Sequence, residues 1–562
     1  MKNIQYLIYL LIQINFIKSS EIFTLNIGVH LLVDNQYIEN SSSLEFQNGK
    51  IEKDLDHPLI YPEYPWENAI HFYTSFLQVP ADLSLARKPM YLLYYACASS
   101  YDILFNNNVS VCISNSTDGI HWEKPLLSYY PYRGNGSEPP RLTNIVFMTD
   151  VNEFFGSVFI DQRPGISRSE IFKMTYEHTS KRYVYIGTSP DGFIWTKGIE
   201  PAHPTADLSD TQTVMLYSPN NGGQYILYGR LNSAVSNTSV YCPGALPSYR
   251  KVVVTLSNES VHGPWSKSVE AFPLGTPDPI QCFDNYNPAT LFYHNIYFLF
   301  SSGYLHWTEI NSGAPIPRAA QNDGVMDIRL ALSRIPQGPF TFLTRDPFIS
   351  RGIGIIDSKT KLVNGTGSDR DAGFVFSSSN GLMDPDFIRS DVDILSPWMY
   401  HIYWGSQTTH AGGGAYLSQY WPGAFTGIFK ARLRREGYVS LSTLSSNPTG
   451  YGWFISKVLS LPNNKKKNRN QQLQMYINAD TSTAGFFAIQ FEDGLTNNPI
   501  EGYTFDECKT LHQNGIRQLL QWRRQNETYS GDLTPLVNYS NGIRFHIHMA
   551  HTKLYSFILS YV

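Results

Sequence analysis

Hydrophobic and polar positions alternate along most of this chain, in short runs separated by turn residues. Aromatic-rich runs at 91–95 and 297–300 are each followed by an alternating run, at 109–114 and 328–332. A period of two residues, bounded by Gly, Pro, Asn and Asp, is the signature of a β-strand. The pattern therefore predicts an all-β chain built from many short strands.

The turn that closes each group of strands is repeated. Asp-Gly-Ile-His-Trp ends at Trp122 and Asp-Gly-Phe-Ile-Trp ends at Trp195, while Gly-Pro-Trp and Gly-Pro-Phe end at Trp265 and Phe340. These anchors are 73, 70 and 75 residues apart, and self-similarity at a fixed period indicates a repeat architecture. We expect each aromatic anchor to pack between neighbouring sheets, which is a structural role.

A fifth, less regular unit is expected at 398–441. Radially repeated four-stranded sheets make a β-propeller, which leaves only short, protected edges. We therefore predict a five-bladed β-propeller over residues 57–445, after an N-terminal lead-in at 20–56. The period then breaks, and several short strands over residues 446–562 predict a C-terminal β-sandwich.

The first 19 residues predict a signal peptide. Lys2 precedes a mostly apolar run at 6–17, and small residues follow at Ser19 and Ser20. The apolar run is shorter than the roughly 20 residues of a membrane span, although an uncut signal anchor is an alternative. We expect a secreted protein with no membrane span after signal removal. Nine glycosylation sequons fit this expectation: Asn40, Asn108, Asn115, Asn135, Asn237, Asn258, Asn364, Asn526 and Asn538.

Composition narrows the function classes. Lys and Arg total 43 against 47 for Asp and Glu, which argues against a nucleic-acid binder with its basic excess. Aromatic residues make up 14% and charged residues 16%, which excludes a disordered chain. Among the five cysteines, Cys97 and Cys112 lie on neighbouring predicted strands, so a disulfide between them is expected, and no cysteine spacing resembles a zinc site.

Several motifs together resemble a known superfamily, the five-bladed β-propeller glycoside hydrolases of families 32 and 43. The match looks closest to secreted glycosyl-hydrolase-like proteins with a C-terminal β-sandwich. Besides the blade closures, the resemblance rests on Pro65-Trp66-Glu67, Ser209-Asp210-Thr211-Gln212, Tyr286-Asn287-Pro288, Asn322-Asp323-Gly324-x-x-Asp327 and Gly437-Tyr438-Val439-Ser440.

The resemblance implies acid chemistry in a central funnel. Glycoside hydrolysis uses two carboxyl groups that flank one bond, one as general acid and one as nucleophile or base. Glu67, Asp210 and Asp284 each directly precede a predicted inner strand, so we expect them to converge within about 10 Å as catalytic residues. A turn or helix cap is the alternative for Asp210, because Asp favours such positions.

Other polar and aromatic residues are predicted to line the funnel and bind substrate. Some of them have a structural alternative: Trp66 can fill the core, a strand histidine is more often a core residue, and a proline-fixed turn explains Asp386. Arg230 can pair with a funnel acid and keep it ionised. The substrate-binding candidates are Trp66, His71, Gln212, Arg230, Tyr286, Asn287, Asp386, His401 and His410.

We predict no metal centre and no cofactor, with a calcium ion held by Asp323 or Asp327 as an alternative. The chain lacks the Trp-x-Asn-Asp-Pro, Arg-Asp-Pro and Glu-Cys motifs of family 32 at the corresponding places, and the fourth blade has no clear acid/base glutamate. The function predicted is that of a glycoside hydrolase acting on a poly- or oligosaccharide. The alternative is a non-catalytic glycan-binding or adhesion propeller.

Overall fold

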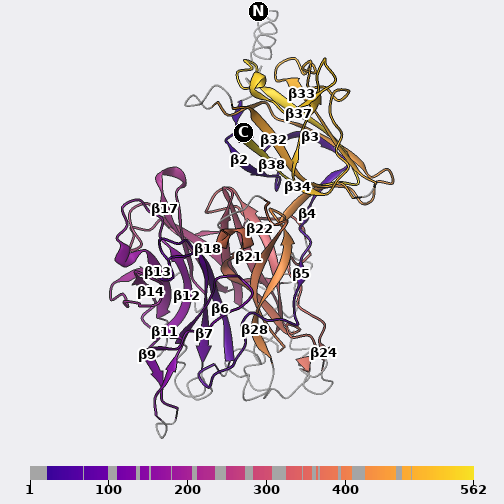
Figure 1. Ribbon diagram of the computed structural model, residues 1–562. Helices are drawn as coiled ribbons and strands as arrows, with labels where there is room; N and C mark the ends of the chain where they lie inside the picture. The colour runs from indigo at the N-terminus through magenta and orange to yellow at the C-terminus, as the bar shows by residue number, and fades with distance from the viewer. Residues whose placement is uncertain are drawn as a thin grey trace, which may run out of the picture. The chain divides into compact units, whose positions relative to one another are not determined.

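The computed structural model (Figure 1) divides into two compact units. Lys50–Arg434 forms the first unit, and Met1–Gly49 together with Arg435–Val562 forms the second. In the described part of the chain the structure is all-β, with only short 3₁₀ turns besides the strands. The structure describes residues 22–67, 69–98, 110–134, 139–150, 153–178, 180–204, 212–234, 248–272, 283–306, 324–344, 346–356, 363–364, 368–389, 394–407, 425–463, 471–482 and 484–562.

Strands of the first unit pair in antiparallel groups of four. In the described residues there are five such groups, each read from its first strand outward, and the fourth strand of the last group comes from the start of the unit. The groups are β6 (Ala69–Val79), β7 (Met90–Ala98), β8 (Ser110–Ser116) and β11 (Ile145–Phe147); β12 (Glu153–Ile160), β13 (Phe172–His178), β14 (Tyr183–Ser189) and β15 (Pro201–Pro204); β16 (Val214–Ser218), β17 (Gln224–Ala234), β18 (Ser248–Ser257) and β19 (Val269–Glu270); β20 (Phe283–Tyr293), β21 (Ile296–His306), β22 (Gly324–Ser333) and β23 (Thr341–Phe342); and β26 (Phe374–Met383), β27 (Trp398–Ser406), β28 (Thr426–Arg434) and β5 (Glu52–Lys53).

The first strands of the five groups lie next to one another in cyclic order: β6, β12, β16, β20, β26 and back to β6. Small polar side chains join them. The Ser75 hydroxyl accepts a hydrogen bond from the Val158 backbone N–H at 3.0 Å, and the Thr74 and Ser378 hydroxyls are 2.5 Å apart. Ser75 also pairs in parallel with Ser379. Short hydroxyl side chains let these strands approach closely where bulkier residues would keep them apart.

Three of the four aromatic anchors pack against the preceding group, as predicted, whereas the Trp122 ring contacts Phe76 and Tyr91 of its own group. The Trp195 ring meets the edge of Tyr94, with ring centroids 6.1 Å apart, and Phe340 meets Tyr228 in the same way at 6.1 Å. The Trp265 indole N–H donates to the backbone carbonyl of Ala202 at 2.8 Å. Trp195, Trp265 and Phe340 therefore each join two neighbouring sheets.

The disulfide prediction is confirmed. Cys97 of β7 and Cys112 of β8 are bonded, and the strands that they join are neighbours in the first group. Cys508 is a buried free thiol, and burial raises its pKa. Cys242 and Cys282 lie outside the described residues.

The second unit holds two six-stranded sheets with the hydrophobic core of the unit drawn from both. Phe545 of one sheet and Phe557 of the other meet edge to face, with centroids 5.6 Å apart. One sheet contains β1 (Phe23–Thr24), β31 (Leu459–Ser460), β37 (Ile543–Ala550), β30 (Tyr451–Ser456), β3 (Ile38–Ser42) and β33 (Phe486–Asp493); the other contains β34 (Gly515–Leu519), β32 (Leu473–Asp480), β38 (Lys553–Tyr561), β29 (Val439–Thr443), β4 (Leu44–Asn48) and β2 (Gly28–Leu31).

Most of the expected lead-in belongs to these two sheets. Residues 22–49 supply four strands that pair with strands more than 390 residues later in the chain. The unit also begins at Arg435, some ten residues before the expected boundary at 445. Pairing across such distances leaves no mark in the local sequence pattern, which is why residues 20–56 were expected only as a lead-in to the propeller. No helix in the described part of the chain is long and apolar enough to cross a membrane.

Candidate functional site

Glu67, the first of the predicted catalytic acids, lies just before β6 and is fully buried. Its Oε1 accepts a hydrogen bond from the Tyr95 hydroxyl at 2.6 Å, and its Oε2 lies 2.8 Å from Lys124 Nζ. The backbone N–H of Glu63 also donates to Oε2 at 3.1 Å. Burial, together with the Glu67 charge, raises the pKa of Tyr95 well above its usual value. Both carboxylate oxygens are engaged inside the protein, which is the geometry of a structural carboxylate.

Trp66 belongs to the same network. Its indole N–H donates to Asn144 Oδ1 at 2.8 Å, and the Asn144 amide in turn donates to the Tyr95 hydroxyl at 2.7 Å. The Trp66 ring is 4% exposed and stacks on Tyr64, with centroids 4.6 Å apart. A ring covered in this way offers no open face to a sugar, so Trp66 fills the core beside Glu67.

Two of the three predicted acids cannot be placed relative to Glu67. Asp210 lies outside the described residues, and so does His410. The backbone of Asp284 is part of β20 and pairs with Tyr304 of β21, while its side chain lies outside the described part. The expected convergence of the acids stays a prediction.

Gln212 and Asn287, close in sequence to Asp210 and Asp284, are fully buried. The Gln212 amide donates to the backbone carbonyl of Thr74 at 3.0 Å, while its Oε1 has no hydrogen-bond partner in the described structure. Neither amide atom of Asn287 has one there. A buried polar atom left unpaired costs about 1–3 kcal/mol, so a further hydrogen-bond partner at either amide would stabilise the structure.

A cluster of cations and aromatic rings lies on the same pair of strand groups. The Arg230 guanidinium is 4.4 Å from the centroid of the Tyr286 ring, and the Arg250 guanidinium is 5.2 Å from it. Arg250 also lies 5.3 Å from the ring of Tyr304, whose edge meets Tyr286. Desolvated cation–π contacts of this kind are worth about 2 kcal/mol. They hold Arg230 and Tyr286, both predicted substrate-binding residues, in fixed positions between the third and fourth groups.

The two predicted histidines that are described are neutral. Burial lowers the pKa of His71 to about 4 and that of His401 to about 3. The His401 ring packs against Phe300 and Phe348, and its Nε2 is 2.9 Å from the Ser377 hydroxyl. His401 is therefore a hydrogen-bonded core residue, which was the structural alternative for a strand histidine.

Asp386 lies in a proline-led 3₁₀ turn, Pro385–Ile388. Its carboxylate accepts a hydrogen bond from the Ser396 backbone N–H at 2.8 Å and pairs with Arg389 at 3.0 Å. These contacts stabilise the turn, so Asp386 has the structural role that was the alternative to substrate binding.

Two buried acids were not among the predicted sites. Asp371, just before β26, is 2.7 Å from Lys53, and burial raises its pKa. Asp161, just after β12, accepts a hydrogen bond from the Tyr225 hydroxyl at 2.8 Å and lies 3.5 Å from Lys173. Like Glu67, each is an acid at the end of an inner strand with a lysine and a tyrosine as partners. Glu67 and Asp371 precede their strands and Asp161 follows its strand, so the shared lysine and tyrosine partners, and not the position, mark a structural motif.

The calcium alternative stays untested. Asp327 Oδ1 accepts a hydrogen bond from the Arg351 backbone N–H at 2.7 Å, and Asp323 lies outside the described residues. Over the described ranges, no three His, Cys, Asp or Glu residues lie together as a metal site would require.

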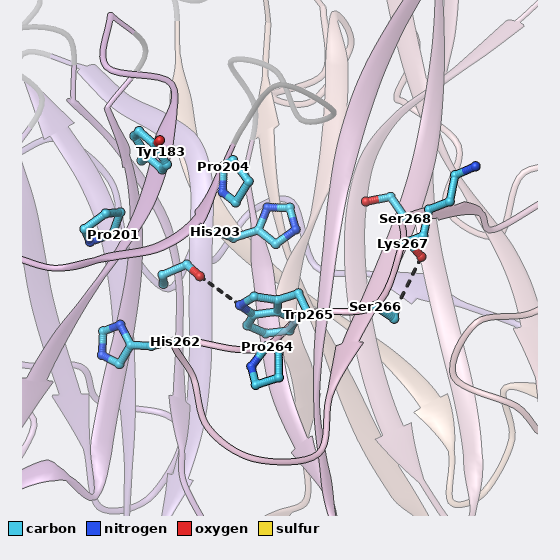
Figure 2. A pocket seen from close by; sticks show the side chains of 11 residues that line it. Tyr183, Pro201, His203, Pro204, His262, Pro264, Trp265, Ser266, Lys267 and Ser268 are labelled. Atoms are coloured by element: carbon cyan, nitrogen blue, oxygen red, sulfur yellow. Dashed lines mark hydrogen bonds between the residues drawn. The ribbon is translucent and has the colours of Figure 1, made fainter.

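A surface pocket of about 450 Å³ lies where the second and third groups meet (Figure 2). The Trp265 indole stands in its wall, edge to face with His203 at 5.6 Å, and Tyr183, Pro201 and Pro264 line it. None of the predicted site residues lies in this pocket. The Trp265 indole is already held by its hydrogen bond to Ala202 of the preceding group. We therefore interpret the pocket as a result of how this anchor packs between the two groups, and not as a binding site.

No family model matches the chain, and no curated protein matches it. Among solved structures, several glycoside hydrolases are similar to it. One, a glycoside hydrolase, is 11% identical over 68% of this chain and 92% of its own, with a TM-score of 0.36. A fructofuranosidase from Schwanniomyces occidentalis complexed with fructose is 12% identical over 90% and 98%, with a TM-score of 0.34. A sucrose-6-phosphate hydrolase from Lactobacillus gasseri is 11% identical over 86% and 93%, with a TM-score of 0.33.

Proposed function

We propose that the first unit is a five-bladed β-propeller and the second a β-sandwich. The support for the propeller is the cyclic order of the five inner strands and the pairing of β5 with β28. Through that pairing a strand from the start of the unit completes the last group, so the ring is closed by hydrogen bonds. The support for the sandwich is the shared core of its two sheets, which are antiparallel except for the pair β1 and β31.

We further propose that the protein is a secreted glycoside hydrolase acting on a poly- or oligosaccharide. The observation that carries this proposal is that Gln212 Oε1 and both amide atoms of Asn287 are buried without a hydrogen-bond partner in the described structure. Sugar hydroxyl groups both donate and accept hydrogen bonds, so they match amide groups that lack partners. Beside them, the Arg230 guanidinium and the Tyr286 ring are fixed by their mutual contact.

In this proposal Asp210 and Asp284 are the two carboxylates of the reaction. They lie two and three residues before Gln212 and Asn287 in the sequence, so the chain leads directly from each acid to a binding amide. One would protonate the leaving oxygen, and the other would act as nucleophile or activate water. Glu67 is assigned to holding the first blade, because its carboxylate is already paired.

The test is hydrolysis of a panel of chromogenic glycosides and oligosaccharides by the glycosylated full chain. Asp210→Asn and Asp284→Asn should each lower kcat by about 10²–10⁴-fold, the usual contribution of an acid or base, without a change in Tm. Gln162→Ala, at an exposed glutamine of the same unit, is the matched control and should keep full activity. Undiminished turnover in both Asp variants would refute the assignment.

Non-catalytic glycan binding is the second candidate, and the closed network around Glu67 favours it. Because the carboxylate of Glu67 is paired within the protein, one of the three acids predicted for catalysis has a structural role instead. Binding on a glycan array with no turnover of any bound glycan would establish this function. Turnover that depends on Asp210 would exclude it.

A further inference from the structure

Two histidines stand side by side on a strand of the second unit, far in sequence from the residues discussed above. His546 and His548 are two positions apart on β37, so their side chains leave the same face of the sheet. β37 lies between β30 and β33, and the His546 side chain is 20% exposed. The pair is therefore held within a sheet yet open to solvent.

The distance between the two rings is suited to a metal ion. Nε2 of His546 and Nε2 of His548 are 3.1 Å apart. Two bonds of about 2.05 Å, usual for imidazole on zinc, would close that gap at an angle of about 98°. This lies between the right angle of square or octahedral ligation and the tetrahedral angle. We propose that His546 and His548 bind a divalent transition-metal ion such as Cu²⁺ or Zn²⁺.

A carboxylate orients the first of these rings. His546 Nδ1 is 2.7 Å from Glu492 Oε1, and Gln490 Nε2 donates to the same oxygen at 2.7 Å. With its Nδ1 proton held by Glu492, neutral His546 keeps a lone pair on Nε2, the atom that faces His548. Ligating histidines are commonly fixed in this way by a carboxylate, which also strengthens them as ligands.

Aromatic packing fixes the orientation of both rings. Phe505 stacks on His548, with centroids 4.3 Å apart, and Tyr451 meets the same ring edge to face at 5.6 Å. Trp453 packs against His546 at 6.0 Å. Ligands held by their neighbours lose little freedom when a metal binds, which favours binding.

The charges around the pair allow a cation. Glu492 supplies a negative charge next to His546. Arg544, two positions before His546 on the same strand, is paired with Glu39. Because the site offers two protein ligands, water molecules would complete the coordination. Without metal, the two Nε2 atoms share one proton in a hydrogen bond; on metal binding that proton moves to His548 Nδ1 or to solvent.

The experiment is a titration of the metal-stripped full chain with CuCl₂ and ZnCl₂, followed by calorimetry and by electron paramagnetic resonance of the copper form. The highest-affinity Cu²⁺ should show two nitrogen ligands in wild type. His546→Asn and His548→Asn should each weaken that step by about tenfold or more, and Glu492→Ala by about 10–100-fold. His512→Asn alters another histidine of the same unit, one bonded to Gly485, and should bind as wild type does.

Equal Cu²⁺ affinity in wild type and both histidine variants would overturn the proposal. His546 and His548 would then be two hydrogen-bonded histidines with no role in metal binding. The wild-type spectrum gives a test that needs no variant, because a tightest copper with fewer than two nitrogen ligands would also contradict the site. Thermal unfolding without metal checks that the variants fold. Added Zn²⁺ should then raise the Tm of wild type and not that of the histidine variants, since a ligand that binds the folded state stabilises it.

Discussion

The polar groups around Glu67 and those around Gln212 and Asn287 all lie at or just before the first strands of their groups, yet they differ in one respect. Around Glu67 each polar atom meets another: carboxylate, lysine, phenol, amide and indole form a closed network. At Gln212 and Asn287 buried amide atoms have no partners in the described structure. The first region is satisfied by contacts within the protein, whereas under the proposed function a bound saccharide completes the second.

This difference shows how little the position of an acid reveals about its role. A carboxylate at the start of an inner strand can be a reactant or can hold two sheets together. What separates the two roles is whether its oxygens are already paired, and the partners of Glu67 lie 28 and 57 residues away in sequence.

Glu67→Gln should have the largest effect on stability. Removal of one partner from a buried ion pair usually costs about 3–5 kcal/mol, and we expect about 3 kcal/mol here, because Glu63 also contacts Lys124 at 2.8 Å. Denaturant unfolding of the first unit measures the loss. A change below about 0.5 kcal/mol, as at ordinary surface positions, would show that the network is not structural.

Loss of the disulfide in the same group of strands should have an effect of about the same size. Cys97→Ser with Cys112→Ser removes a bond that closes a 15-residue separation, which is worth about 3 kcal/mol in the chain-entropy model. The drop in Tm should be reproduced by wild type under reducing conditions. A double variant as stable as wild type would show that this bond does not stabilise the first group of strands.

His401→Leu tests the neutral core through pH. The folded-state pKa of His401 is about 3, below its ordinary 6.5, so below pH 6.5 the unfolded chain takes up a proton that the folded protein refuses. Stability therefore falls as the pH drops from 6.5 toward 3, by about 1.36 kcal/mol per unit at most. Between pH 7 and 5 wild type should lose about 2 kcal/mol more than the variant. Parallel stability curves would contradict this.

Asn287→Leu should have the smallest effect on stability and a clear effect on binding. Replacement of an unpaired buried amide by an apolar group of similar size should be neutral or stabilise the fold by about 1 kcal/mol. Saccharide affinity should fall about tenfold, since one lost hydrogen bond is worth about 1.4 kcal/mol. Isothermal calorimetry with the substrate found in the panel measures this loss. A destabilised variant with full affinity would reverse the assignment.

Local patterns predicted much of the fold. The aromatic anchors, the strand runs and the Cys97–Cys112 bond could be read from the sequence because turns and strand alternation are local properties. The sheet joined by residues 22–49 could not, because its partners lie at the other end of the chain.

The site was harder to predict for the same reason. Gln212, Asn287, Arg230 and Tyr286 were recognised as polar or aromatic residues near inner strands, whereas the pairing of Glu67 with Tyr95 and Lys124 depends on strands brought together by folding. The metal pair has a local sign, His-x-His on a strand, but Glu492 is 54 residues away. The alternation of the sequence predicted which residues share a face of a strand. Which of their polar groups are already hydrogen-bonded depends on partners from distant strands, and these are known only from the folded structure.

The most direct test compares saccharide affinity in folded Glu67→Gln and Asn287→Leu proteins, measured by calorimetry with the same ligand at a temperature where both are folded. The account predicts that Glu67→Gln is less stable and binds as wild type does, whereas Asn287→Leu is as stable as wild type and binds about tenfold more weakly. Weak binding by Glu67→Gln together with full affinity in Asn287→Leu would contradict the account.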